Sequence, residues 1–375
     1  MRTRSLWLGV VVASRAFVPR PRPRPRTLQG AVTFGAPLVD DGYLAAEESE
    51  GPALLVYLPG FDGNALAPFL QWPALGDAGF DVRCASVDPA DRSTLDAYAD
   101  AVVAYVRREK GGRPLLLVGE SFGGILAVAV AQRLGDAVAG VVLVNPATSY
   151  ARSRLAAAAP RVAELGGVVY PLGLASLLPL FVDRHSFPAL VSIVTSRLLP
   201  CVVDTPRREA YMGRVATTLG RRLPFMPRAT LRWRLEEWLA QGSARFADAD
   251  GLAQPTLIVY GDADATLPSA DEALRLEAAL RRRGARVATH RVPGAGHAAT
   301  LGSRVDLRAA VAAFFGDDAN FATILDGAPT AMRADAAAPG EASAYFGLFP
   351  REHPSVDPST YGSPALDARN HHRGS

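Results

Sequence analysis

Residues 119–123 read Gly-Glu-Ser-Phe-Gly, which is the pattern G-x-S-x-G with a serine between two glycines. The apolar residues 115–118 precede this pattern, and the apolar, helix-like residues 125–130 follow it. A sharp turn from a strand into a helix exposes a serine hydroxyl above a sheet, where a neighbouring base can deprotonate it. We therefore predict that Ser121 is a nucleophile. The alternative is a plain turn that happens to contain a serine, and the partners described below argue against it.

An acid and a histidine follow the serine in the order that such a nucleophile requires. The β-branched residues 256–260 predict a strand that ends just before Asp264, and functional groups of open α/β sheets lie beyond strand ends. The next expected strand, residues 286–292, leads into a glycine-rich loop that ends at His297. We expect His297 to accept the proton of Ser121, and Asp264 to orient the imidazole and stabilise its charged form.

Two choices within this set rest on position in the chain. Asp262 is the rival acid; we prefer Asp264 because it lies further beyond the strand, and we expect Asp262 to bond the turn. Of the six histidines, only His297 combines the expected order with a glycine-rich loop. The others lie in an expected insertion, within a strand or near the C-terminal end: His185, His290, His353, His371 and His372.

A fourth component would stabilise the negative charge that develops on a carbonyl oxygen during acyl transfer. Residues 54–58 predict a buried strand, and Pro-Gly-Phe-Asp-Gly-Asn follows at residues 59–64. In a sheet of this type, one backbone N–H comes from the loop after that strand and the other from the residue after the nucleophile. These are Phe61 and Phe122, and each such donor contributes about 3–4 kcal/mol in the transition state. Taken alone, residues 59–64 would be an ordinary turn.

Alternating strand and helix patterns predict one α/β domain, residues 27–318, with a mostly parallel central sheet and helices on both faces. Residues 151–250 interrupt this alternation with apolar, proline-punctuated segments, and we expect them to form a helical cap inserted between two core strands. Caps of this kind build an apolar pocket and exclude water. Residues 319–375 are rich in Ala, Pro, Ser and Gly and are expected to form a partly disordered tail, short pieces of which are docked by their aromatic residues Phe321, Tyr345 and Phe346.

Composition argues against several other classes of protein. The net charge of +3 is small and its arginines gather near the N-terminus, so a nucleic-acid surface is not expected. Cys84 and Cys201 are far apart in the chain and have no metal-type spacing, so we expect neither a disulfide framework nor a metal site. We expect no cofactor.

The first 26 residues have the composition of a targeting presequence. Arg2 and Arg4 precede the short apolar residues 6–13, and residues 20–26 alternate Arg with Pro and lack acidic side chains. Residues 13–19 resemble the A-S-A-F-x-P motif of bipartite plastid presequences, with one extra Arg. A plastid location is therefore expected, and a secretory signal is the alternative.

Four segments carry a resemblance to a known family. They read L-P-G-F-D-G, V-G-E-S-F-G-G, N-P-A-T-S-Y and L-P-S-A-D-E-A, at residues 58–63, 118–124, 145–150 and 267–273. Over about residues 50–315 the chain resembles the plant and algal esterase/lipase/thioesterase family that includes the phytyl ester synthases, also described as diacylglycerol acyltransferase-like proteins. The resemblance implies an α/β-hydrolase fold, action on fatty acyl esters and the triad Ser121, Asp264 and His297.

The chain also departs from that family. After His297, where members read H-x-L-L-L-E, residues 297–302 have smaller side chains, His-Ala-Ala-Thr-Leu-Gly. Many members carry a second, acyltransferase-like domain with an H-x4-D motif, and no histidine here has Asp five positions on. We therefore expect a hydrolase half alone, or a truncated gene product.

Together these residues predict a serine-dependent lipid esterase or acyltransferase. An acyl lipid or acyl thioester would acylate Ser121, and the acyl group would pass to water or to a lipid alcohol such as phytol or diacylglycerol. Peripheral contact with a plastid membrane or lipid droplet is a further expectation, and contact with nucleic acid is not expected. The alternatives are another hydrolase of the same fold (lipase, thioesterase or peptidase) and a non-catalytic lipid-binding protein.

Overall fold

The computed structural model describes residues 32–35, 51–65, 67–182, 186, 226–301, 305–325, 343–345 and 349–351. The expected presequence, Cys201, His185, Phe346 and the histidines after residue 352 lie outside these residues.

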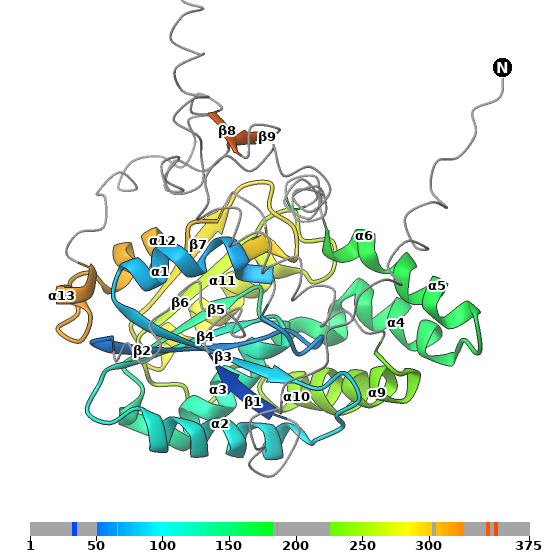
Figure 1. Cartoon of the computed structure of the whole chain (residues 1–375), viewed down its shortest axis with the longest axis horizontal. Coiled ribbons are helices and arrows are strands. Elements are labelled where there is room, and N and C mark those ends of the chain that lie inside the picture. Colours follow the sequence, from blue (N-terminus) through cyan, green and yellow to red (C-terminus); the bar gives the residue numbers. More distant parts are fainter. Residues whose placement is uncertain are drawn as a thin grey trace, which may run out of the picture. The chain divides into compact units, whose positions relative to one another are not determined.

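A twisted sheet lies at the centre of the described residues (Figure 1). Its seven strands have the order β1-β3-β2-β4-β5-β6-β7. Their bounds are β1 Val32–Gly35, β2 Ala53–Leu58, β3 Phe80–Val87, β4 Leu115–Glu120, β5 Gly140–Val144, β6 Thr256–Gly261 and β7 Val287–Val292. Only β1 runs antiparallel to its neighbour; the other pairs are parallel. Every residue of β2, β4, β5 and β6 is buried, as expected for parallel strands covered on both faces.

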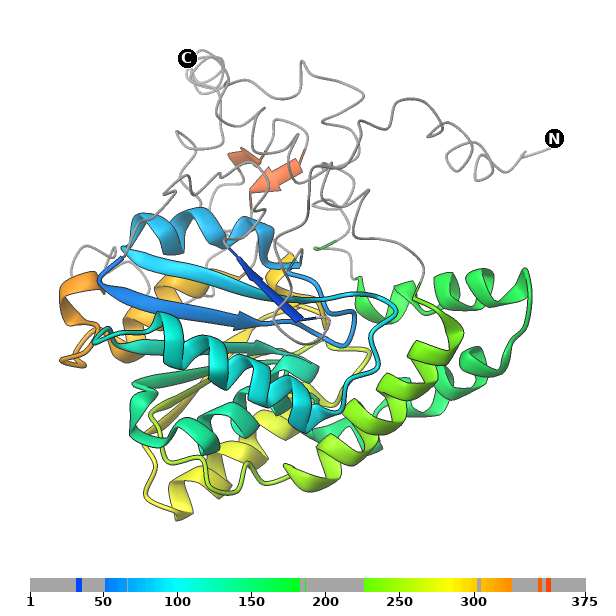
Figure 2. The same ribbon diagram turned by 60° about the horizontal axis from the view of Figure 1, so that its bottom comes forward.

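Helices cover both faces of the sheet, and Figure 2 shows α2 and α3 on the side opposite α1. Alternate side chains of β2 point to opposite faces: Leu54 and Val56 join one apolar core, whereas Leu55 and Tyr57 join the other. The first core includes side chains of α2 (Leu95–Glu109), α3 (Phe122–Leu134) and α11 (Ser269–Arg282). The second includes side chains of α1 (Trp72–Asp77), α12 (Leu307–Phe315) and α13 (Ala322–Leu325). The predicted α/β-hydrolase sheet with helices on both faces is confirmed.

The chain leaves the sheet after β5 and returns at β6, and the described elements between these strands are all helices. Their elements are η3 (Ala147–Arg152), α4 (Arg154–Glu164), α5 (Val169–Ser176), α6 (Leu178–Phe181), α9 (Arg228–Trp233), the π-helical segment η5 (Arg234–Gln241) and α10 (Gly242–Arg245). The predicted insertion of a helical cap between two core strands is therefore confirmed. No helix in the described part of the chain has the length and apolarity needed to cross a membrane.

Short elements complete the described chain. Three-residue to four-residue 3-10 turns lie at η1 (Ala67–Leu70), η2 (Gly135–Ala137) and η6 (Ala299–Leu301). Strand β8 (Ser343–Tyr345) pairs with β9 (Phe349–Arg351) in a separate antiparallel ribbon.

The packed core continues past residue 318, where the tail is expected to begin. Phe321 is fully buried, and its ring centroid lies 5.4 Å from that of Phe315 and 6.1 Å from that of Phe80. Phe321, Ile324 and Leu325 thus pack in the core beside α12, which agrees with the expected docking of Phe321.

Candidate active site

Ser121 stands at the turn between β4 and α3 in a conformation that side-chain-bearing residues rarely adopt. Its φ of 56° and ψ of −117° are positive-φ geometry, which costs of order 1–3 kcal/mol unless the surroundings hold it. Three backbone hydrogen bonds of 2.9 Å hold it here: Ser121 N donates to Val144 O, and its carbonyl accepts from Gly124 N and Ala147 N. The strained turn is therefore fixed by β5 and by the residues that follow it.

Glycines surround Ser121 because backbone segments meet there without room for a Cβ. A Cβ at Gly119 would lie 2.2 Å from the carbonyl oxygen of Gly123, and one at Gly123 would lie 1.9 Å from that of Leu58. At Gly124 it would lie 2.8 Å from Cβ of Pro146. The residues V-G-E-S-F-G-G thus allow β2, β4 and the start of α3 to pack at contact distance beneath the serine.

The structure brings Ser121, His297 and Asp264 into one hydrogen-bonded chain. His297 Nε2 lies 3.0 Å from Ser121 Oγ, and His297 Nδ1 lies 2.8 Å from Asp264 Oδ2. All three side chains are largely buried. This is the geometry that a base needs to take the proton of a serine while a carboxylate orients its ring.

The charged groups around His297 favour protonation of its neutral imidazole to the cationic form. Burial alone would lower the pKa of His297, but the adjacent Asp264 carboxylate, and further away Glu120 and Asp62, raise that pKa above its usual value. Burial alone would raise the pKa of Asp264, but the His297 ring and the hydrogen bonds of His297 and Ser269 hold it below its usual value. Asp264 is therefore poised to stay ionised beside an imidazole that accepts a proton.

The two candidate acids have different surroundings. Asp264 accepts hydrogen bonds from Thr266 N (2.7 Å), Leu267 N (3.0 Å) and Ser269 Oγ (2.6 Å), which leave one edge of its Oδ2 for His297. Asp262 instead pairs with Arg291 on β7 and accepts from Gly294 N at 2.6 Å. The structure thus places Asp264 beside the histidine and Asp262 at the turn, as the sequence predicts.

Asn145 is a site residue to which sequence reasoning assigned no role, although it begins the N-P-A-T-S segment. The fully buried side chain donates from Nδ2 to the carbonyls of His297 (2.7 Å) and Gly296 (3.2 Å), and its Oδ1 accepts from Gly261 N at 2.9 Å. It therefore ties the end of β5 to the end of β6 and to the histidine loop. A positive φ of 41° at this strand end suits asparagine better than most residues.

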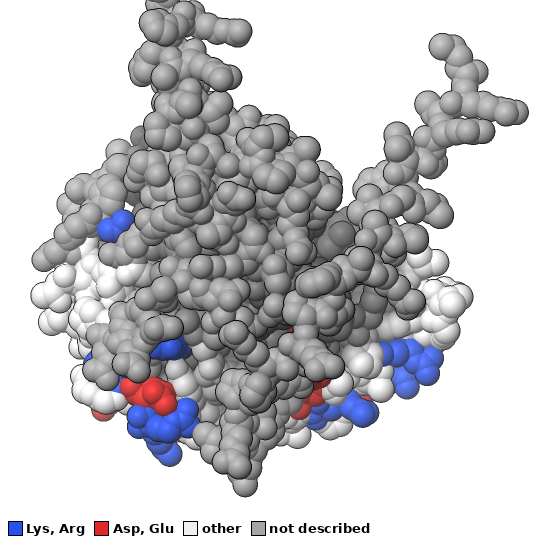
Figure 3. Space-filling view, in the orientation of Figure 1, with Lys and Arg blue, Asp and Glu red and all other residues white. Residues whose placement is uncertain are grey.

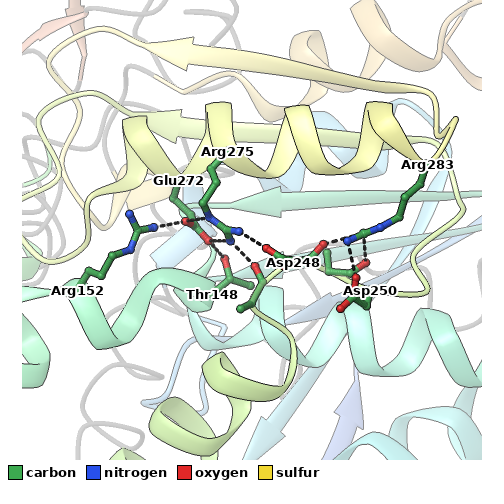
Figure 4. A network of polar contacts seen from close by, with 9 residues as sticks. Thr148, Arg152, Asp248, Asp250, Glu272, Arg275 and Arg283 are labelled. Carbon is green, nitrogen blue, oxygen red and sulfur yellow. Dashed lines mark hydrogen bonds and ion pairs between the residues drawn. The ribbon is translucent and has the colours of Figure 1, made fainter.

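A polar network connects the N-P-A-T-S and L-P-S-A-D-E-A segments (Figure 4). The fully buried Glu272 of α11 accepts from the hydroxyl of Thr148, pairs with Arg152 at 2.5 Å and pairs with Arg275 at 2.8 Å. Ser269, one turn before Glu272, donates to Asp264. Two of the four segments that carry the family resemblance thus hold the start of α11, and with it Asp264, the acid that bonds His297.

Glu120 lies directly before Ser121 and was also missed. Its buried carboxylate accepts hydrogen bonds of 2.7 Å from Tyr57 Oη and Thr300 Oγ1. Burial raises its pKa, although these hydroxyls oppose the rise. The sequence signal available for Glu120 was an acidic residue at the variable position x directly before the serine of G-x-S-x-G.

The loop after β2 and the first residue of α3, which carry the predicted oxyanion donors, both adjoin Ser121. A Cβ built on Gly60 would lie 3.7 Å from Cβ of Ser121, so the loop that carries Phe61 runs against the nucleophile. Phe122 follows Ser121 as the first residue of α3. The Phe181 ring of the cap lies 5.9 Å from the Phe61 ring and 5.6 Å from the His297 ring, so apolar groups border the site.

Comparison with known proteins places these observations in a family. The model of the alpha/beta hydrolase fold family matches residues 53–302. The chain is 30% identical over 240 residues to phytyl ester synthase 1, chloroplastic, of Arabidopsis thaliana. The aligned region covers 62% of this chain and 33% of that protein. It is 37% identical over 106 residues to phytyl ester synthase 2, chloroplastic, of the same plant. This aligned region covers 28% of this chain and 15% of that protein. The chain therefore spans a third or less of the length of these curated relatives.

Among solved structures, MenH from S. aureus superposes with a TM-score of 0.48 at 14% identity, over 76% of this chain and 97% of that one. The family model covers the sheet from β2 to β7 together with Ser121, Asp264 and His297. The chain belongs to the alpha/beta hydrolase fold family.

Proposed function

We propose that this protein is a serine-dependent esterase or acyltransferase that acts on fatty acyl esters or thioesters. The observation that carries the proposal is the chain of hydrogen bonds from Ser121 through His297 to Asp264 on a strained strand-to-helix turn. A plain structural serine does not need positive φ, a buried imidazole at 3.0 Å and a carboxylate behind that imidazole.

In the first half of the cycle, Ser121 Oγ attacks the acyl carbonyl carbon while His297 Nε2 takes its proton. The carbonyl oxygen becomes an oxyanion, which the backbone N–H groups of Phe61 and Phe122 stabilise. When the oxyanion collapses, the bond to the leaving alcohol or thiol breaks and His297 returns the proton to it. The product is an acyl ester on Ser121 and a neutral histidine.

In the second half, an acceptor hydroxyl reverses these steps. His297 removes the acceptor's proton as its oxygen attacks the acyl carbon on Ser121, and the same proton then goes to Ser121 Oγ as that bond breaks. Water gives a free fatty acid, and a lipid alcohol gives a new ester. The chemistry of the two fates is the same, so access of water to the site decides between them.

Two features support a lipid alcohol, phytol or diacylglycerol, as acceptor. Phe61 and Phe181 place aromatic rings beside the reacting groups, where they favour an apolar acceptor over water. The names of the two curated relatives describe phytyl ester synthesis. Their chloroplastic names also support a plastid location.

Peripheral contact with a lipid surface is part of the proposal. Exposed large apolar side chains gather on α5 and α6, at Val168, Val169, Leu172 and Leu178. The space-filling view shows uncharged surface where α5 lies and Lys or Arg side chains beside it (Figure 3). This surface would let the cap approach a plastid membrane or lipid droplet that holds the substrates.

The test offers the full chain a labelled acyl donor, a galactolipid or an acyl-carrier thioester, with phytol and water both present. Products are resolved by mass spectrometry, and Ser121→Ala is run alongside. Phytyl ester that disappears in the variant supports acyl transfer through Ser121. Free fatty acid alone would make the protein a lipase or thioesterase, and full activity in Ser121→Ala would overturn the nucleophile.

A further inference from the structure

A buried positive charge in the cap lies against the active-site loop. Arg234, the first residue of the π-helical segment η5, is 0% exposed. Burying a guanidinium costs several kcal/mol unless its donors are satisfied. Here Nη1 donates to the carbonyls of Phe61 (2.8 Å) and Asp62 (3.2 Å), and Nη2 donates to those of Asp88 (2.7 Å) and Asp91 (3.4 Å), whereas the buried Nε has no hydrogen-bond partner among the described residues.

These carbonyls belong to two loops at the same edge of the sheet. Phe61 and Asp62 follow β2, whereas Asp88 and Asp91 follow β3. Phe61 carries one of the two proposed oxyanion donors, and its own carbonyl is held by Arg234. With the carbonyl of Phe61 held on one side and the 2.9 Å bond from Gly63 N to Gly60 O closing the turn, the direction of the Phe61 N–H is restricted.

Gly63 explains why the loop can receive the arginine. Its φ of +77° favours glycine, and a Cβ there would lie 3.2 Å from Arg234 Nη1 and 3.2 Å from Cβ of Val87. The second glycine of L-P-G-F-D-G is thus a position at which a side chain would crowd the guanidinium. A larger residue would separate Arg234 from the carbonyls it holds.

The same helical segment also contacts the residue with the second donor. The guanidinium of Arg234 lies over the Trp238 ring at 4.4 Å, and that ring stacks on Phe122 with centroids 4.6 Å apart and planes 10° apart. Trp238 Nε1 donates to Ser93 O at 2.8 Å, which fixes the indole. Arg234 and Trp238 therefore contact Phe61 and Phe122, one each. A π-helical turn is rare and is frequent at functional sites.

We propose that Arg234 is a positioning residue for the oxyanion hole, which it holds from the cap by fixing the carbonyl of Phe61, with Trp238 supporting Phe122 through the stacked ring. The inference rests on the proposed serine chemistry. It predicts that the cap contributes to stabilisation of the tetrahedral intermediate as well as to the acyl pocket.

The experiment compares transition-state with ground-state affinity in Arg234→Met and Arg234→Lys. The substrate is p-nitrophenyl butyrate, a soluble ester. A trifluoromethyl ketone adds to Ser121 and places an oxyanion in the hole, whereas the corresponding alcohol does not. Arg245→Met is the matched control, because Arg245 lies further along the same helical region and is exposed and paired with Asp96.

In Arg234→Met we expect kcat to fall roughly 10- to 100-fold, less than the 10²–10³ for outright loss of an oxyanion donor. The affinity for the ketone should fall by a similar factor, while KM and the affinity for the alcohol stay within about threefold of the wild-type values. Arg234→Lys keeps the charge and part of the hydrogen bonding. Its kcat and ketone affinity should therefore lie between those of Arg234→Met and wild type. The pH dependence of kcat/KM should still follow the titration of His297, as in wild type. Arg245→Met should have the kcat and ketone affinity of wild type.

Equal loss of ketone and alcohol affinity, or a rise in KM with unchanged kcat, would overturn the positioning role. If Arg234→Met does not fold, the ketone affinities of Arg234→Lys and Trp238→Phe test the proposal instead. Unchanged ketone affinity in both variants would overturn the positioning role. A wild-type protein that forms no ketone adduct on Ser121 would overturn the proposed serine chemistry itself.

Discussion

The side-chain amide of Asn145 donates a 2.7 Å hydrogen bond to the backbone carbonyl of His297, 152 residues further along the chain. The same side chain accepts from Gly261 N at the end of β6. A single buried amide at the end of β5 thus holds the histidine loop against the end of β6, beyond which the acid lies. The position of His297 therefore depends on a residue whose side chain hydrogen-bonds to backbone groups and not to the Ser121 or Asp264 side chains.

Asn145→Ala should weaken both the fold and the reaction. It leaves the buried Gly261 N–H without its acceptor, a loss of about 1–3 kcal/mol, and places alanine at positive φ. Because the histidine loop loses its tie, kcat should fall by about 10-fold or more. Urea unfolding and steady-state kinetics measure the two effects. Asn320→Ala, at an exposed amide that bonds only within its own turn, is the control, and equal effects in both variants would contradict the assignment.

Asp264→Asn and Asp262→Asn should separate the two acids. The amide at 264 can no longer hold the productive tautomer of His297, so kcat should drop by up to about 10⁴. The change at 262 weakens an exposed pair with Arg291 and should leave kcat within a few-fold of wild type. A reversed order in ester hydrolysis rates would assign the acid to Asp262.

Glu120→Gln should shift the pH dependence of kcat/KM to lower pH. The Glu120 carboxylate is one of the charges that raise the pKa of His297, and hydrolysis needs the neutral imidazole in the free enzyme. Removing the negative charge lowers that pKa, so activity persists to lower pH as the solution is acidified. The maximal kcat should fall, because the imidazolium loses part of its stabilisation. A pH profile that coincides with wild type, alongside the exposed control Glu109→Gln, would show that Glu120 is structural only.

Glu272→Ala should destabilise the protein by about 3 kcal/mol. That value is at the low end for removing one partner of a buried ion pair, because Arg152 and Arg275 are partly exposed. The exposed control Glu109→Ala should cost less than about 1 kcal/mol. Urea unfolding measures both, and similar losses in the two variants would mean that the network between Thr148 and α11 contributes little.

Leu172→Ser should slow reaction at a lipid surface without slowing reaction in solution. Leu172 is 72% exposed on α5, beside Val168 at 85%. Fewer apolar side chains would insert, so turnover of esters in anionic vesicles and co-sedimentation with them should fall, while hydrolysis of p-nitrophenyl butyrate stays the same. Leu274→Ser, at a 56% exposed leucine on α11, should change neither. Equal vesicle binding by the two variants would remove the lipid role of α5.

The sequence alone was enough to predict the fold class and the place of the reactive groups along the chain. Buried strands read as continuous apolar runs, and G-x-S-x-G between such a run and a helix requires a narrow range of backbone geometry. The chain order of Ser121, Asp264 and His297 follows from the same pattern, since functional groups of a parallel sheet gather beyond the carboxyl ends of its strands. The catalytic roles themselves remain predictions that the experiments above test.

Only the tertiary structure decided which groups touch. Asp262 and Asp264 are two residues apart, and their roles differ because β7 brings Arg291 to one and the loop after β7 brings His297 to the other. Asn145, Glu120 and Arg234 gain their roles from partners that are near in space but distant in sequence, and no local pattern encodes such pairs. The burial of Phe321 likewise depends on Phe315 of α12 and Phe80 of β3, which only the fold brings beside it. Hydrophobic periodicity and turn chemistry act over a few residues, whereas burial and hydrogen-bond partners are properties of the assembled fold.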